Sequence, residues 1–295
     1  MKKILLIAER GEIDRYRTKR FTEEAVKIGW SIDLICSNDV LILVDRILSD
    51  GSEIEISDYQ LVFSIGNGYY HHYLLFLADR LGIFTWPRVE HFNLSDKFFE
   101  GIFLNSINIP TPKTILLSSK DEIRVKDLVG EVGGFPCVIK KVTGSEGRYV
   151  DLVGSVEEVF SFVESMPRGI TGKKNILLQE YIQESRGTDF RVYCVGDNVL
   201  GAIKRTASDD NFKANISQGG TARQFKLTEE MIDYSKKIMK EGRLLFAGID
   251  FIKSKKGYLV VEINTSADFK GFESATGINV AKEVVQVLTN NYLKK

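Results

Sequence analysis

Apolar residues follow two different periods within residues 1–92 of this chain. Short continuous apolar runs have the length of buried strands, whereas other segments repeat an apolar side chain at the spacing of an amphipathic helix. Strands and helices that alternate in this way are typical of a mainly parallel sheet, so we expect an N-terminal α/β domain. In chain order, the expected elements are a strand at 4–8, a helix at 18–28, strands at 31–36 and 61–65, and a helix at 70–81.

The pattern changes around Ile109-Pro110-Thr111-Pro112, where two prolines predict extended backbone. Strand signals separated by tight turns then dominate, and amphipathic segments interrupt them. This mixture indicates an α/β (α+β) protein of more than one domain. A helix is expected to begin at 93–96, further helices lie at 155–165, 229–245 and 278–293, and strands lie at 176–182, 189–195, 199–205, 248–253 and 258–264.

Composition and charge exclude several classes of function. Forty basic and forty acidic residues give zero formal net charge, which argues against a broad nucleic-acid-binding surface. No apolar stretch is long enough to cross a bilayer, and the run at 4–8 is too short for a signal peptide. Cys36, Cys137 and Cys194 are widely separated, so a reducing compartment suits the chain better than a disulfide framework. We therefore expect a cytoplasmic protein that binds neither nucleic acid nor membrane.

Three oxygen-bearing side chains stand on the last two expected strands. Glu262 and Asn264 are two positions apart and so point to the same face, and Asp250 lies on the neighbouring strand of an expected hairpin. Antiparallel pairing could bring the three side chains together, and their oxygens suit a hard cation such as Mg²⁺. An exposed polar strand face would give the same pattern, because such faces are common in antiparallel sheets. The pattern alone leaves both interpretations open.

A lysine and a glycine-containing loop form a second candidate site. Lys140 leaves an apolar strand and precedes Gly144-Ser145-Glu146-Gly147, whose backbone N–H groups could approach phosphate oxygens closely. A plain hairpin turn explains the loop equally well, since glycines mark turns in many proteins. The spacing is not that of a Walker A loop. Lys97 is a further candidate phosphate partner, although taken alone it would be assigned to a solvated helix surface.

Other chemistry-bearing residues give weaker signals. Gly66-Asn67-Gly68 follows the carboxyl end of an expected strand, where α/β sheets place ligands, and we expect a small-molecule contact there. His71, His72 and His91 form no metal-binding set with nearby acids. The serines lack a nucleophile elbow, and no cysteine has a clear histidine partner in sequence, so no covalent nucleophile is expected.

The order of these motifs indicates a family more strongly than any single motif does. Lys97 precedes the Ile-Pro-Thr-Pro break, the strand lysine and the glycine loop follow, and the carboxylate-bearing strands come last. Between them stand Leu178-Gln179-Glu180-Tyr181-Ile182, Gly187-Thr188-Asp189-Phe190-Arg191, Ala202-Ile203-Lys204-Arg205 and Asn215-Ile216-Ser217-Gln218-Gly219-Gly220. Over nearly the whole chain, this series resembles the ATP-grasp superfamily, most closely its RimK-type carboxylate–amine ligases, which include glutamate ligases and LysX-like enzymes. The resemblance implies an ATP-grasp fold with an N-terminal parallel-sheet pre-ATP-grasp domain at 1–92, a central subdomain with the phosphate loop at 93–172, and a C-terminal subdomain with the adenine and metal sites at 173–295.

The resemblance also implies roles for individual residues. Asp250, Glu262 and Asn264 would bind Mg²⁺ or Mn²⁺. Arg205 would neutralise the transferring phosphoryl group, and Arg191 would be a second catalytic cation near the substrate carboxylate. The implied ATP-binding residues are Lys97, Lys140, Gly144, Ser145, Gly147, Lys213 and Asn215 at the phosphates, Gln179, Glu180, Tyr181 and Ile182 at the adenine, and Asp189 at the ribose.

The activity implied by the resemblance is ATP-dependent formation of an amide or peptide bond through an acyl phosphate, either by adding an amino acid such as glutamate to an amine or by activating a terminal carboxylate. An ATP-grasp small-molecule kinase and a non-catalytic nucleotide-binding module are the alternatives. Thr265-Ser266-Ala267-Asp268-Phe269 stands where glutamate-adding members often carry Ser-Pro-Gly, which leaves the acceptor open. The expected partners are ATP and small-molecule or peptide carboxylates and amines, or a carrier-protein tail, and the enzyme is expected to be a homo-oligomer.

Overall fold

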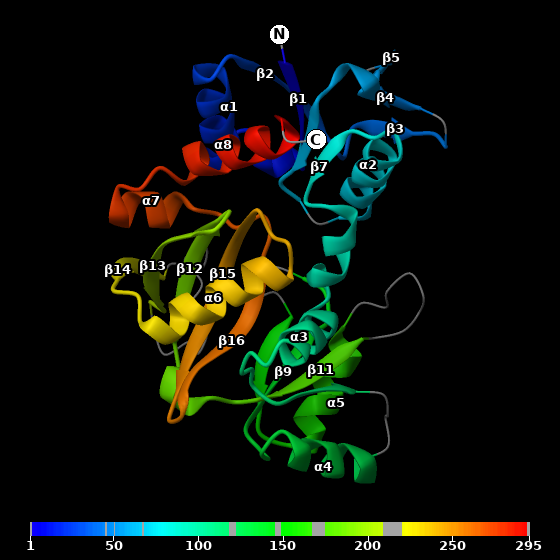
Figure 1. The fold of residues 1–295 in the computed structure, drawn as a ribbon. Helices are drawn as coiled ribbons and strands as arrows, with labels where there is room; N and C mark the ends of the chain where they lie inside the picture. Colours follow the sequence, from blue (N-terminus) through cyan, green and yellow to red (C-terminus); the bar gives the residue numbers. More distant parts are fainter. Residues whose placement is uncertain are drawn as a thin grey trace.

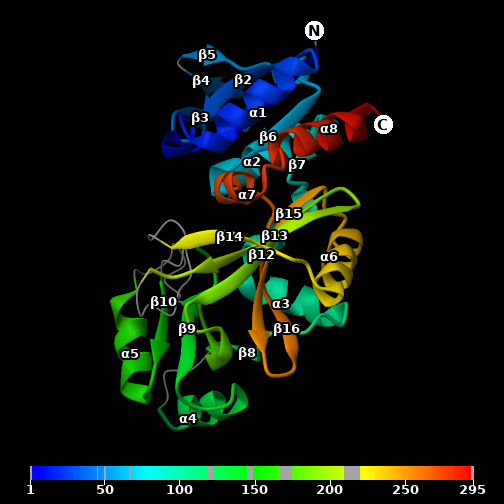
Figure 2. The same ribbon diagram turned by 90° about the vertical axis from the view of Figure 1, so that its left-hand side faces the viewer.

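The computed structural model describes residues 2–293 except 45, 50, 67, 118–121, 145–148, 167–174 and 209–219. The described strands form four sheets. Figure 1 shows them in three tiers, with the N-terminal sheet at one end, a five-stranded sheet in the middle and the central part of the sequence at the other end. Figure 2 shows the same stacking after a quarter turn, with both chain ends in the N-terminal tier.

The N-terminal tier is built on the expected parallel sheet. Its elements are β1 (Lys2–Ala8), α1 (Tyr16–Lys27), β2 (Trp30–Cys36), β3 (Val40–Ile42), β4 (Ile47–Ser49), β5 (Ser52–Glu53), β6 (Leu61–Ser64), α2 (Tyr69–Arg80) and β7 (Phe84–Trp86), with 3₁₀ helices at Arg10–Glu12, Ile56–Asp58 and Val89–Ser95. The strand order is β2-β1-β6-β7, and every pairing is parallel. The small antiparallel sheet β3-β4-β5 was not expected, because strands this short carry little alternation.

Strand β1 is buried on both faces, which explains why its sequence is continuously apolar. Leu6 packs in the same cluster as Phe21 of α1, whereas Ile7 packs with Leu74 of α2 on the opposite face. Because parallel strands end at one edge of a sheet, the carboxyl ends of β1, β2 and β6 meet there.

The tier at the end of the molecule opposite the N-terminal tier is built from the central part of the sequence and is called the central tier below. It has its own buried core. Its elements are α3 (Lys97–Ser106), β8 (Thr114–Leu117), α4 (Glu122–Glu131), β9 (Cys137–Lys141), β10 (Val150–Val153), α5 (Val156–Ser165) and β11 (Ile176–Glu180). The antiparallel order is β10-β9-β11-β8, and Ile139 and Leu178 pack with Val125 and Val159 of the two helices. Strand β11 lies beyond the domain boundary expected at residue 172 and still pairs with β9 and β8.

The middle tier is a five-stranded antiparallel sheet. Its elements are a 3₁₀ helix at Gln183–Ser185, β12 (Thr188–Val195), β13 (Asn198–Thr206), β14 (Thr221–Phe225), α6 (Glu229–Glu241), β15 (Phe246–Ser254), β16 (Gly257–Asn264) and α7 (Lys270–Thr276), after which the chain continues into α8 (Val280–Leu293). The order is β14-β13-β12-β15-β16, and the expected hairpin of the last two strands is confirmed. Val192, Ile249 and Ile263 form an apolar cross-strand row that packs with Met231 of α6. The alternate positions therefore face the other side of the sheet.

The last helix returns to the beginning of the chain. Helix α8 packs against α1 in the N-terminal tier (Figure 1), so the two ends of the sequence share one core. Helix α6 ends at Glu241, earlier than the expected residue 245, because Arg243 adopts a left-handed conformation with φ 50°. In the part of the chain that the structure describes, no helix combines the length and apolar character needed to cross a membrane.

Candidate active site

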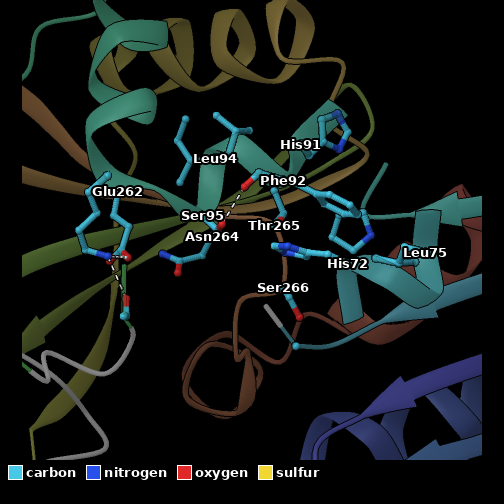
Figure 3. Close-up of a pocket in the computed structure, with 15 residues that line it drawn as sticks. His72, Leu75, His91, Phe92, Leu94, Ser95, Glu262, Asn264, Thr265 and Ser266 are labelled. Carbon is cyan, nitrogen blue, oxygen red and sulfur yellow. Dashed lines mark hydrogen bonds and ion pairs between the residues drawn. The ribbon is translucent and has the colours of Figure 1, made fainter. Parts of the chain in front are cut away.

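A cleft lies where the N-terminal tier meets the end of β16 and the start of α3. Its enclosed volume is about 50 Å³, and its mouth opens to solvent. Gly66 and His72 come from the N-terminal tier, and the opposite wall is the segment from Glu262 to Ser266. Figure 3 shows these walls facing each other, with His72 stacked on Phe92 at a ring-centroid distance of 4.0 Å. The expected small-molecule contact at Gly66 therefore coincides with a cleft.

Sheet register brings the expected metal ligands together. Asp250 pairs directly with Glu262, and Asn264 follows two residues later on the same face. Glu262 and Asn264 both line the cleft (Figure 3). The Asn264 amide nitrogen is buried without a hydrogen-bond partner among the described residues. The sequence-based expectation that these three side chains share one sheet face agrees with this arrangement.

Two arginines hold Asp250 from the neighbouring strands. Arg191 binds Asp250 through both ends of its guanidinium, with Nε–Oδ1 and Nη2–Oδ2 distances of 2.6 Å. Arg205 donates to Asp189 at 2.5 and 2.7 Å and reaches Asp250 Oδ2 at 2.9 Å. Although burial alone would raise it, these guanidiniums hold the pKa of Asp250 below its ordinary value, whereas burial raises the pKa of Asp189 to about 6. The result is a buried, preorganised cluster of alternating charges.

Two lysines approach the same region from the central tier. Asp96 caps α3 by accepting from Phe98 N at 2.9 Å, and this fixes Lys97 at the first position of the helix. Lys97 Nζ donates to Glu262 Oε1 at 2.9 Å and to the Gly144 carbonyl at 3.0 Å. It therefore links α3 to the start of the expected phosphate loop and to the carboxylate strand.

Lys140 is buried on β9, and its Nζ donates to Gln179 Oε1 at 3.0 Å. Burial, together with the nearby charge of Lys97, lowers the pKa of Lys140 to about 8. A lysine held in this way gains an ionic partner when an anionic ligand arrives. Lys140 and Lys97 thus form one positive region beside the carboxylates.

The side chains of the candidate metal site fit a hard divalent cation. Asp250 Oδ2 accepts hydrogen bonds from both arginines, whereas Oδ1 accepts from Arg191 and keeps a further lone pair. Glu262 uses one oxygen for Lys97. Within the described ranges, no group of three or more His, Cys, Asp or Glu side chains could hold a metal. A cation here would therefore depend on the amide oxygen of Asn264 and on ligand phosphates, as is typical for Mg²⁺.

The expected adenine-contacting residues stand at the end of β11, away from the cleft lining. The Glu180 N–H donates to the Lys113 carbonyl at 2.8 Å, and its carboxylate accepts from the Lys113 N–H at 3.2 Å. The Tyr181 hydroxyl is buried and has no hydrogen-bond partner in the described part of the chain, and Ile182 is buried. Their role remains a prediction. Four further candidates, Ser145, Gly147, Lys213 and Asn215, lie outside the described residues.

One buried carboxylate in this region was missed by sequence reasoning. Glu100 lies one turn after Lys97 on α3 and is buried, and neither of its oxygens has a hydrogen-bond partner among the described residues. Burial, and then the nearby charge of Glu262, raises the pKa of Glu100 well above its ordinary value. Its spacing from Lys97 places both side chains on one helix face, and this spacing in the sequence could have indicated that Glu100 lies near the site.

The Gly66 wall of the cleft is held by a buried histidine. His71 Nδ1 lies 2.7 Å from Ser64 Oγ, and its Nε2 lies 2.9 Å from Ser37 Oγ. A Cβ atom on Gly66 would come within 2.4 Å of the His71 ring, so only glycine fits there. His71, expected to be structural or exposed, is structural.

A His71→Gln variant is expected to show a flatter pH dependence of stability than the wild type. Burial lowers the pKa of His71 from 6.5 to about 4, so the folded state disfavours the protonated ring. The stability contributed by the neutral ring is complete above pH 6.5 and is lost as the pH falls toward 4, by about 3 kcal/mol. Denaturant unfolding across this range measures the difference. Parallel stability curves for the two proteins would contradict it.

Comparison with known proteins agrees with this geometry. Residues 94–288 match the family model of the RimK-like ATP-grasp domain. The chain is 37% identical over 221 residues to a "Probable alpha-L-glutamate ligase" of Legionella pneumophila (strain Corby), covering 75% of this chain and 72% of that protein. It is 32% identical over 283 residues to "Probable alpha-L-glutamate ligase 2" of Shewanella denitrificans, covering 94% and 92%.

Among solved structures, the RimK domain protein ATP-grasp from Sphaerobacter thermophilus superposes with a TM-score of 0.73 at 18% identity. The match covers 97% of this chain and 98% of that one, which confirms the expected ATP-grasp fold along the whole molecule. The chain belongs to the RimK-like ATP-grasp family of ATP-dependent carboxylate–amine ligases.

Proposed function

We propose that this protein joins an amino acid of the glutamate type to its partner substrate through an amide bond. The observation that carries the proposal is the cross-strand row Arg191–Asp250–Glu262, which Lys97 completes at the edge of the cleft. The row places cations and oxygen donors where a triphosphate and a carboxylate can meet. The names of the two relatives, both alpha-L-glutamate ligases, support glutamate as the amino acid.

The reaction needs activation because a carboxylate is a poor electrophile. A carboxylate oxygen attacks the γ-phosphorus of ATP, and the bond from that phosphorus to ADP breaks. The amine nitrogen then attacks the acyl carbon, phosphate leaves, and the nitrogen loses a proton. The chain supplies positioning and fixed charge for both steps.

Each charged residue has a distinct task in this proposal. Lys97 and Lys140 bind phosphate oxygens, and Arg205 offsets charge on the transferring phosphoryl group. Arg191 orients Asp250 and lies near the substrate carboxylate. Mg²⁺, or Mn²⁺, bound by Asp250, Glu262 and Asn264 would neutralise phosphate charge when present.

The lining of the cleft favours recognition by neutral hydrogen bonds. Burial lowers the pKa of His72, and it lowers the pKa of His91 to about 4, so both rings are neutral near pH 7. Lys97 is the cation among the described lining side chains, and Glu262 already pairs with it. A small molecule, a peptide or a carrier-protein tail could present the second reacting group at the open mouth.

Three further features belong to the proposal. The protein acts in the cytoplasm, which is supported by three cysteines that are all free and buried. It forms a homo-oligomer. Its domains follow the division 1–92, 93–172 and 173–295, with β11 contributing to the central sheet.

A coupled assay of ADP release with mass spectrometry tests the function. Purified protein is incubated with ATP, Mg²⁺, single amino acids and candidate acids or peptides. We expect ADP together with a product that has the summed mass of both substrates less one water. ADP accompanied by a stable phosphorylated product would instead identify a kinase, and no ATP binding at all would overturn the proposal.

A further inference from the structure

Arg17, on α1, touches both walls of the cleft. Its Nη2 donates to the Ile65 carbonyl at 2.9 Å, next to Gly66 of the N-terminal wall. Its Nη1 donates to the Ser266 carbonyl at 2.5 Å, on the wall that follows the β16 carboxylates. Gly66 and Ser266 both line the cleft, and Figure 3 shows Ser266 at its edge. One guanidinium therefore spans two segments that are far apart in the sequence.

The Arg17 side chain is itself held in place. Its Nε donates to Glu12 Oε2 at 2.8 Å, and each of these two side chains is only 12% exposed. The backbone carbonyl of Glu12 accepts from Thr18 Oγ1 at 2.7 Å, which ties the carboxylate-bearing turn to α1. A planar guanidinium can satisfy several acceptors in fixed directions, which a lysine ammonium cannot reproduce.

The two carbonyls that Arg17 binds belong to two segments that are held in place by different neighbours. The Ile65 side is backed by His71 and its serine hydrogen bonds. The Ser266 side continues directly from Glu262 and Asn264 on β16. The contacts of Arg17 thus join the Ile65–Gly66 segment to the segment that follows the strand with the oxygen donors.

We propose that Arg17 is a positioning residue. It fixes the width and alignment of the acceptor cleft, so that a substrate bound there is held in the correct position relative to the nucleotide site. This inference rests on the proposed function in placing the acceptor in the cleft. The described hydrogen bonds of Arg17 lie on the N-terminal side and at Ser266, and none is to a residue proposed above to bind ATP. Its loss should therefore affect the acceptor and spare ATP.

Arg17→Ala tests the proposal with two matched controls. Arg15→Ala removes the ion pair that Arg15 makes with the same Glu12 carboxylate, at 2.6 Å. Arg20→Ala removes links from α1 to Glu273 and Asn279, away from the cleft lining. We expect Arg17→Ala to lower kcat/KM for the acceptor on the order of 10- to 100-fold, mainly through KM, with KM for ATP within about twofold. Arg17→Lys should recover part of the loss, and both controls should keep the wild-type KM values.

Hydrogen exchange provides a readout that does not depend on ligase activity. In Arg17→Ala, amides in 61–66 and 263–269 are expected to exchange about tenfold faster, and those of α6 are expected to be unchanged. Unchanged exchange in both segments would overturn the proposal, as would an acceptor KM equal to that of wild type. If wild-type protein forms no amide, the proposed function fails, and the exchange result alone still decides the role of Arg17.

Discussion

The Asp250→Asn, Glu262→Gln double variant is expected to lose ATP-dependent amide formation by about 10³-fold or more. The two carboxylates are register partners on β15 and β16, and between them they contact Arg191, Arg205 and Lys97. Neutralising both removes the anionic oxygens proposed to hold Mg²⁺, whose charge stabilisation amounts to roughly 4 kcal/mol. Single-turnover measurement of product at saturating ATP and Mg²⁺ gives the loss directly.

Stability has to be separated from chemistry in this experiment. Asp250 is buried between two guanidiniums, so Asp250→Asn also leaves buried positive charge poorly compensated. Glu262→Gln alone is the milder change, because the Glu262 side chain is 30% exposed. Glu230→Gln is the matched control, since Glu230 accepts from Tyr258 N at 3.3 Å at the far end of the same hairpin. Near-normal turnover in a folded double variant would contradict the metal assignment.

Much of the fold could be predicted because its strands are long or continuously apolar. Strand β1 is buried on both faces, and the hairpin of β15 and β16 alternates clearly between apolar and polar positions. Short elements were missed because they carry too few residues to show a period, as with β3, β4 and β5. The end of α6 depended on the backbone of Arg243, which periodicity does not report.

The residues of the candidate site also differ in whether a sequence pattern could reveal them. Asp250, Glu262 and Asn264 could be found because their spacing along strands decides which face they occupy. Arg17 could not, because its importance arises from contacts across the tiers. Arg17 meets Ser266 across 249 positions of sequence, and no local pattern encodes such a meeting. The cleft is thus assembled by tertiary packing from segments that lie far apart in the sequence.

Arg205→Lys is expected to lower kcat by about 10²-fold while leaving ATP affinity nearly unchanged. Arg205 is buried on β13 and bridges Asp189 and Asp250 with hydrogen bonds of 2.5 to 2.9 Å. Lysine retains the positive charge but presents it as a point, so it cannot hold both carboxylates in the same geometry. Removing the charge with alanine would leave the half-buried Asp189 and the buried Asp250 short of a partner and endanger folding, at a cost of roughly 3–5 kcal/mol.

The measurement compares single-turnover rates with ATP affinity determined separately by titration. Arg223→Lys is the matched control, because Arg223 lies on the adjacent strand β14 and is exposed. We expect the control to keep the wild-type kcat, and Arg205→Lys to have a lower kcat at unchanged ATP affinity. This result would show that the Arg205 guanidinium stabilises the transition state of phosphoryl transfer. An equal loss of ATP affinity and kcat/KM would instead assign Arg205 to ground-state binding. An unaltered kcat in Arg205→Lys would exclude a role of the Arg205 guanidinium in the chemical step. The ammonium group of lysine would then serve that step as well as the planar guanidinium does.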